Sequence, residues 1–205
     1  DGVLYSGGDT ILAADDVSGI CAILDGVRRT LSSGNPHPRI EIAFTVGEEA
    51  GLFGGKALDL SVFQSSCCFF LDSPGLLGRL VNGAPGHVRF AIHVKGKPAH
   101  AGANPQNGRN ALLAAAQASL ALHTISRHSD GPSRINVGIL KAGTGRNVIP
   151  DNAVIKFETR GGSTAINEFM EGEARRMIKA AADMYGVTVK MVARGSAASG
   201  NSSPD

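Results

Sequence analysis

The first third of the chain alternates helical and strand-like hydrophobic patterns. Apolar side chains recur every three or four positions over residues 17–31, which predicts an amphipathic helix. Residues 40–46 alternate in polarity and are rich in β-branched side chains, and residues 67–71 form a short apolar run, so both segments predict strands. Apolar strands that alternate with helical segments are typical of a parallel α/β layer whose sheet is covered on both faces.

A different order of elements begins near Gly86. Alternating polarity predicts four strands, at residues 87–94, 134–140, 153–159 and 187–192. An Ala/Leu-rich stretch over 111–127 and an apolar stripe that ends at Gly186 predict two helices between these strands. The stripe consists of Ile166, Phe169, Met170, Ala174, Met177, Ile178, Ala181 and Tyr185. The resulting order β-α-β-β-α-β is the ferredoxin-like arrangement.

The change of pattern near residues 82–85 predicts two domains. We expect a partial α/β domain over 1–82, a ferredoxin-like domain over 83–194 and a return segment towards the first domain over 195–205. The sequence opens with Asp1 and no initiator Met, and it stops inside a Ser/Gly/Pro-rich stretch. We therefore expect a chain that is truncated at both ends.

Composition narrows the possible function classes. The 205 residues are 42% hydrophobic and 19% charged, a balance that supports a folded core and excludes a disordered chain. A formal net charge of +2 and the absence of Trp argue against a nucleic-acid partner. No stretch reaches the roughly 18 apolar residues that a membrane span needs, so we expect no membrane partner either.

The three cysteines indicate a reducing compartment. Cys67 and Cys68 are adjacent in a predicted strand, where neighbouring side chains point to opposite faces, so a bridge between them is unfavourable. We expect buried, reduced thiols and a cytoplasmic protein.

Acidic side chains fall where the predicted helix begins and where the predicted strands end. Asp15 lies at a loop-to-helix junction, Glu48 and Glu49 follow one strand, and Asp72 ends the other. Ligands of open α/β sheets bind beyond the carboxyl ends of the strands, so these residues predict one shared site. Carboxylates that lie close together need a proton or a cation, and a divalent metal would satisfy them. The alternative is that they are ordinary solvated loop charges.

The adjacent glutamates suit two different roles in such a site. Neighbouring side chains diverge, so one of Glu48 and Glu49 could bind a metal while the other faces the substrate. The substrate-facing carboxylate would then serve as the general base for a metal-activated water.

Five short motifs give the chain its resemblance to a known family. They are Leu12–Gly19, Phe44–Gly51, Leu71-Asp72, Gly96–Gly102 and Gly145–Pro150. Taken together and in this order, they resemble the co-catalytic di-zinc peptidase and deacylase family. That family includes peptidase T, succinyl-diaminopimelate desuccinylase, glutamate carboxypeptidase and the aminobenzoyl-glutamate hydrolases, and the peptidase T-like members are the most similar.

The resemblance implies a metal centre in the first domain. Asp15 would bridge two divalent metal ions, with zinc as the expected metal and cobalt or manganese as alternatives. Glu49 and Asp72 would each bind one ion, and Glu48 would be the general base. The peptide bond between Asp15 and Asp16 would be cis, a geometry that a non-proline residue adopts only when the surrounding structure enforces it.

The resemblance also implies a role for the second domain. The fold would be part of a zinc-peptidase-like α/β catalytic domain followed by a ferredoxin-like lid and dimerisation domain, and the protein would be a homodimer. His100 would reach the partner's active site and stabilise the developing oxyanion. Asn147 and Arg160 would hold the substrate, with the planar guanidinium of Arg160 suited to a terminal carboxylate.

The function implied is that of a metal-dependent hydrolase, a peptidase T-like exopeptidase (aminopeptidase) that cleaves a peptide or acyl-amide bond. Two alternatives stay open: an acyl-amino-acid deacylase with the same machinery, and a non-catalytic dimerisation or binding module. The family's metal site also needs a His-x-Asp element upstream of the Asp15 motif and a further His near the C-terminus, and neither is in this sequence. We therefore expect the chain to be inactive on its own.

Overall fold

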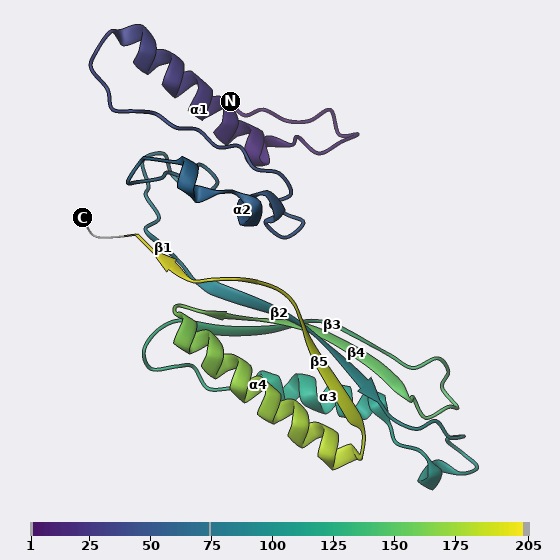
Figure 1. The fold of residues 1–205 in the computed structure, drawn as a ribbon. Helices are drawn as coiled ribbons and strands as arrows, with labels where there is room; N and C mark the ends of the chain where they lie inside the picture. Colours follow the sequence, from purple (N-terminus) through teal and green to yellow (C-terminus); the bar gives the residue numbers. More distant parts are fainter. Residues whose placement is uncertain (1, 74, 203–205) are drawn as a thin grey trace. The chain divides into compact units, whose positions relative to one another are not determined.

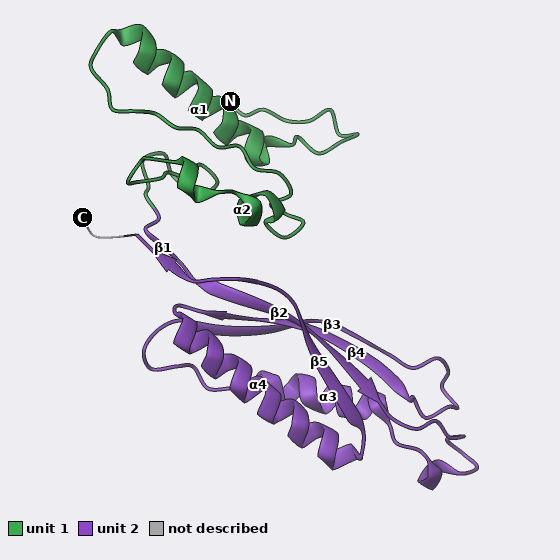
Figure 2. Ribbon diagram, in the orientation of Figure 1, with its two compact units in different colours: residues 1–80 green, residues 81–205 purple. Residues whose placement is uncertain are grey.

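The computed structural model describes residues 2–73 and 75–202, which form two compact units. The first unit runs from Asp1 to Leu80 and the second from Val81 to Asp205 (Figure 2).

The first unit contains one long helix and little other regular structure. Helix α1 (Ala14–Ser33) is the predicted amphipathic helix, and it ends at Gly34 in the left-handed conformation (Figure 1). Asp16 caps its start, because the Asp16 Oδ1 accepts a hydrogen bond from the Gly19 amide at 2.9 Å. A short helix α2 (Phe53–Ala57) and a 3₁₀ turn (Leu60–Val62) follow.

The strands predicted at 40–46 and 67–71 are not formed. Within the described residues of the first unit, neither segment has a paired strand. A strand exists only when a neighbour accepts and donates its backbone hydrogen bonds, and here the Glu41 carboxylate instead binds the amides of Gln64 and Ser65, at 2.9 and 2.7 Å. The apolar pattern that predicted these strands is therefore present without the sheet.

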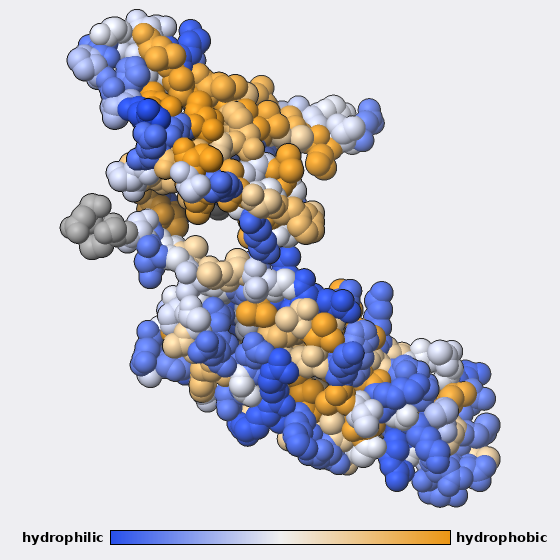
Figure 3. Space-filling view, in the orientation of Figure 1, coloured by the Kyte–Doolittle hydropathy of each residue, from blue (hydrophilic) through white to orange (hydrophobic). Residues whose placement is uncertain are grey.

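The apolar side chains of the first unit are exposed. Gly19 is its one buried residue among those described, whereas Phe70 is 86% and Phe69 is 69% exposed. Figure 3 shows apolar residues gathered on the surface of this unit. The predicted burial of the thiols is wrong for the same reason, since Cys21, Cys67 and Cys68 are unpaired but exposed. The described residues of this unit form no hydrophobic core of their own.

The second unit is an antiparallel sheet with two helices on one face (Figure 1). Its strands are β2 (Gly86–Lys95), β3 (Ser133–Ala142), β4 (Asn152–Gly161) and β5 (Thr188–Ala197), in the spatial order β3-β4-β2-β5. Its helices are α3 (Ala111–Leu122) and α4 (Thr164–Tyr185). Element order and strand order together confirm the ferredoxin-like arrangement.

The hydrophobic core lies between the sheet and the two helices. Ile92 on β2 and Ile155 on β4 are fully buried against Leu122 and Met170 from the helices. Phe90 and Phe157 stack at a centroid distance of 5.0 Å between neighbouring strands. The alternation of each strand therefore sends its apolar side chains to one face and its polar side chains to the other.

The helix ends follow from their capping residues. Asn110 caps α3 through a 3.0 Å bond from the Leu113 amide, and α3 ends at Leu122, five residues before the predicted 127. The amides of His123 and Thr124 turn back to carbonyls three residues earlier, which tightens and closes the helix. Helix α4 ends at Gly186 in the left-handed conformation, as predicted.

A short two-stranded ribbon lies where the chain enters the second unit. Strand β1 (Gly83–Ala84) pairs antiparallel with β6 (Gly200–Asn201), and the Ser202 amide donates to the Asn82 carbonyl at 2.7 Å. Strand β5 extends to Ala197, beyond the predicted 192. The last residues of the predicted return segment, 203–205, lie outside the described residues.

The helices of the described residues do not include one that could cross a bilayer, because none is both long and apolar enough.

Because the core of the second unit lies on one face of its sheet, a substitution in that core should destabilise the unit more than a substitution at an exposed position. Replacement of Ile155 by Ala should lower the free energy of unfolding by about 2–4 kcal/mol, because it leaves a cavity beneath the helices. The matched change Leu120→Ala, at a side chain that is 68% exposed, should cost less than about 0.5 kcal/mol. Urea denaturation followed by circular dichroism measures both values, and equal losses would contradict this placement of the core.

Candidate functional site

Asp15 and Asp72 lie together in the first unit. Their side chains are hydrogen-bonded, and Asp16 and Glu48 add negative charge around Asp72. The pKa of Asp72 is raised, first because folding removes part of its hydration and then because of the hydrogen bond and charge of Asp15. Two carboxylates separated by 57 positions in the sequence therefore compete for one proton or cation.

The backbone at the start of α1 positions this pair. The Asp15–Asp16 peptide bond is cis, which confirms the geometry implied by the family resemblance. Asp15 and Asp16 both depart from helical backbone angles, although they lie within the bounds of α1. Asp16 binds the Gly19 amide at the start of the helix, and the neighbouring Asp15 interacts with Asp72.

Glu48 and Glu49 lie in a tight turn. The Glu48 carbonyl accepts hydrogen bonds from the amides of Gly51 and Leu52, at 2.9 and 2.8 Å. Glu48 acts on Asp72 through its charge, whereas no contact of the Glu49 side chain with Asp15 or Asp72 is observed among the described residues. Three of the four predicted acidic residues, Asp15, Glu48 and Asp72, thus influence one another within one neighbourhood.

The donor chemistry of this site fits a divalent cation in kind but is incomplete. Touching carboxylates, one with a raised pKa, are the environment that a hard or borderline cation relieves. Over residues 2–73 and 75–202, however, no three or more His, Cys, Asp or Glu side chains form a group that could hold a metal ion. Asp15 and Asp72 are therefore a pair of carboxylates that could contribute to a metal centre but do not form one by themselves.

His100 lies in a loop of the second unit that is tied to the β3–β4 hairpin. His100 forms an isolated antiparallel bridge with Val148, and the Ala101 amide donates to the Asn147 carbonyl at 2.9 Å. At the base of the loop, a Cβ on Gly96 would collide with the Arg109 carbonyl oxygen, so this position requires glycine. Two loops distant in sequence are thereby held as one rigid end of the domain.

Hydrogen bonds fix the imidazole of His100. Its Nδ1 accepts from the amides of Gly102 and Ala103, at 3.2 and 3.1 Å. Because Nδ1 is an acceptor, the proton of the neutral ring is on Nε2, which leaves Nε2–H as a donor. A fixed neutral donor is the chemistry that an oxyanion needs.

Arg160 lies near the end of β4, on the face of the sheet opposite the helices. Its Nε donates to Glu158 at 2.8 Å, and Arg89 lies 4.0 Å from the other oxygen of the same carboxylate. Glu158, which orients Arg160, was not among the site residues predicted from the sequence. The sequence could have indicated this role, because Glu158 and Arg160 are two positions apart on a strand and therefore share a face.

Asn147 and Arg160 do not lie near each other within one chain. Asn147 belongs to the turn before β4, together with His100, and Arg160 is the penultimate residue of the strand. Since a strand rises about 3.3 Å per residue, the eight steps from Asn152 to Arg160 along β4 separate them by about 26 Å. Both could contact one small substrate only if different subunits supplied them.

Known proteins are similar to this chain in sequence. A family model described as a peptidase dimerisation domain matches residues 82–186. The indole-3-acetyl-aspartic acid hydrolase of Enterobacter agglomerans is 54% identical over 175 residues, which cover 82% of this chain and 40% of that protein. A p-aminobenzoyl-glutamate hydrolase chain of Escherichia coli is 43% identical over 175 residues, with the same coverage of 82% and 40%. The chain thus spans about 40% of the length of these relatives.

A solved structure shows the same fold. Aminopeptidase PepT from Bacillus cereus is 29% identical, with a TM-score of 0.83 over 98% of this chain and 53% of that one. The match confirms the predicted fold class, part of an α/β catalytic domain followed by a ferredoxin-like dimerisation domain.

The contact between Asp15 and Asp72 predicts the effect of removing one charge. In the metal-free chain, Asp15→Asn should lower the pKa of Asp72, because the variant removes the nearest negative charge. A carboxyl group with a raised pKa binds protons more tightly in the folded state, so stability falls as pH rises from its ordinary pKa to the raised one. The variant should shrink that pH-dependent loss.

NMR titration of the carboxyl carbons measures this pKa directly. The matched control is Asp25→Asn, which removes the same charge elsewhere on α1, where Asp25 pairs with Arg28 and Arg29. An unchanged pKa of Asp72 in Asp15→Asn, or an equal change in the control, would show that the two carboxylates do not interact.

Proposed function

Because the chain belongs to the M20 family of peptidases and related hydrolases, we propose that its protein is a metal-dependent hydrolase of a peptide or acyl-amide bond. The observation that carries the proposal is the contact between Asp15 and Asp72, with the charge of Glu48 beside it. A carboxyl group whose pKa is perturbed by burial and by a specific charged neighbour, as that of Asp72 is, is a candidate functional-site residue.

The acidic residues of the first unit would hold the metal. Asp15, Glu49 and Asp72 would be ligands of two divalent ions, with zinc expected and cobalt or manganese as alternatives, and ligands beyond the described set would complete both spheres. When bound, such ions lower the pKa of a coordinated water towards neutrality.

Glu48 would act as the general base. Its turn brings it close enough for its charge to influence Asp72. Glu48 would accept the proton of the attacking water and later deliver it to the nitrogen of the leaving amine.

The second unit would contribute from two subunits of a homodimer. His100 would donate from Nε2–H to the oxyanion of the partner's substrate, and Asn147 would reach the same site because the two loops are joined. Arg160 lies at the other end of the sheet and would bind the substrate carboxylate in its own subunit. The separation of about 26 Å along β4 favours this division over one in which a single chain supplies all three residues.

Two substrate classes share this machinery. A peptidase T-like exopeptidase is supported by the likeness to aminopeptidase PepT. An acyl-amino-acid hydrolase is supported by two relatives whose names specify amides of aspartate and glutamate, at 54% and 43% identity. The higher identities favour an amide of an acidic amino acid, with Arg160 on one of its carboxylates. The free thiols of Cys21, Cys67 and Cys68 support a cytoplasmic location.

A substitution at Glu48 tests the proposed base. In the full-length protein, Glu48→Gln should lower kcat by about 10²–10⁴-fold, because the amide cannot accept a proton. Bound metal, measured by elemental analysis, should stay unchanged. The matched control Glu168→Gln, on the exposed face of α4, should keep normal turnover. Normal turnover in Glu48→Gln with metal bound would refute the assignment, and no hydrolysis by the unmodified protein would favour the non-catalytic module.

A further inference from the structure

The open face of the sheet in the second unit is strongly basic. Strands β2 to β5 contain eight Lys and Arg residues and a single acidic residue, Glu158. The eight are Arg89, Lys95, Arg134, Lys141, Lys156, Arg160, Lys190 and Arg194. Strand register places them on the face away from α3 and α4, since the core residues occupy the alternating positions.

This charge is local and does not reflect the whole chain. The formal net charge is only +2, because acidic residues lie elsewhere, for example Glu168, Glu171 and Glu173 on α4. Cations on neighbouring strands repel one another unless something of opposite charge lies between them. The described ion pairs on this face are Glu158 with Arg160 and Arg89, and Asp151 with Lys95. They leave five of the eight cations without a counter-charge among the described ion pairs.

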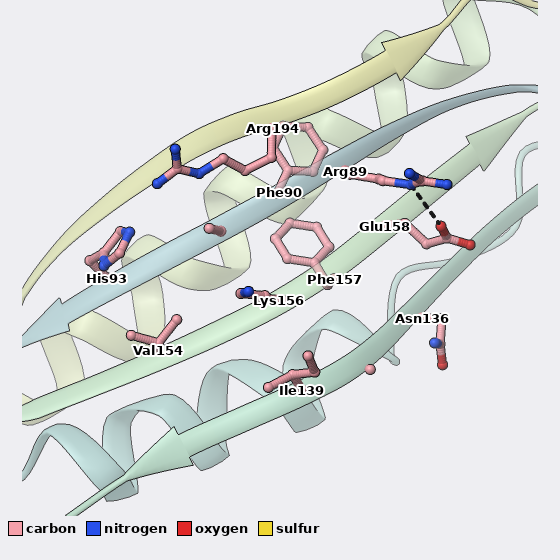
Figure 4. A pocket seen from close by; sticks show the side chains of 12 residues that line it. Arg89, Phe90, His93, Asn136, Ile139, Val154, Lys156, Phe157, Glu158 and Arg194 are labelled. Carbon is pink, nitrogen blue, oxygen red and sulfur yellow. Dashed lines mark ion pairs between the residues drawn. The ribbon is translucent and has the colours of Figure 1, made fainter. Parts of the chain in front are cut away.

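A hollow of about 660 Å³ lies in the middle of this face. Arg89, His93, Lys156 and Arg194 rise around it in Figure 4, and Arg89 is paired there with Glu158. Ala91, Ile139 and Val154 supply apolar contact between these cations. Arg194 also lines the hollow, and it is the extra residue that β5 carries opposite Arg89 and Phe90.

We propose that this hollow binds a small organic dianion, an apolar body that carries two carboxylates. The volume is that of a small-molecule site. Cations on three different strands provide more than one anchor, and the apolar residues between them match a hydrocarbon or aromatic body. Arg160 and the carboxylate cluster of the first unit play no part in the proposal, which stands or falls apart from the hydrolase activity.

The same face fits a nucleic acid less well. Single strands bind where aromatic rings offer a surface for base stacking, and the rings next to this hollow, Phe90 and Phe157, are buried at 2% and 4% exposure. A phosphate backbone also needs a continuous groove along which it can lie. The hollow on this face is a single confined depression. A small ligand is therefore the better match.

Calorimetric titration of the 205-residue chain with benzene-1,3-dicarboxylate tests the proposal. Lys156→Gln and Arg194→Gln should each weaken binding by about tenfold, since each removes one charged hydrogen bond to the ligand. Lys179→Gln is the matched control, because it removes the same charge from α4, on the helical side. It should leave the affinity unchanged, and benzoate should bind more weakly than the dicarboxylate. Circular dichroism confirms that each variant is folded.

Three results would overturn the proposal. The first is no binding of the dicarboxylate by the unmodified chain. The second is an equal loss of affinity in Lys179→Gln, which would show that binding depends only on the net charge of the chain. The third is tighter binding of a single-stranded oligonucleotide that is lost in Lys156→Gln and Arg194→Gln, which would assign the face to nucleic acid. Because the readout is binding, none of these outcomes bears on hydrolysis.

Discussion

Burial of one face of the β2–β5 sheet under α3 and α4 is the interaction on which the rest of the structure depends. Ile92, Ile155 and Met170 meet in that layer, and no comparable core exists among the described residues of the first unit. Because apolar side chains occupy alternate strand positions, the positions between them are left for polar groups. The same packing thus creates both the stable half of the chain and a basic open face.

A sheet packed in this way is also a stiff spacer. The hairpin that carries Asn147 and the loop that carries His100 are joined at one end of β4, and Arg160 is held by Glu158 near the other. The distance between the two ends is set by strand length and cannot be closed by side-chain motion. A dimeric arrangement, in which one subunit supplies His100 and Asn147 and the other supplies Arg160, resolves this separation without deforming the domain.

The sequence predicted elements well where local pattern and burial agree. The stripe on α4, its end at Gly186 and the four alternating strands of the second unit were all predictable, because each is satisfied by neighbours inside the same unit. Residues 40–46 and 67–71 have equally clear patterns but no paired strand among the described residues, so pattern alone was insufficient. The sequence placed Asp15 and Asp72 in one site by assuming strand ends that are not formed among the described residues, yet the two residues do interact. The role of Glu158 depended on a cross-strand arrangement of charges.

The central claim is that a complete site draws on two chains, and a subunit-mixing experiment tests it most directly. In the full-length protein, Glu48→Gln and His100→Ala homodimers should each be inactive. Co-refolding them in equal amounts should restore about one quarter of wild-type turnover, because half of the dimers are then mixed and each mixed dimer has one intact site. If His100 instead serves its own subunit, every site carries a defect and the mixture stays inactive, which would contradict the account.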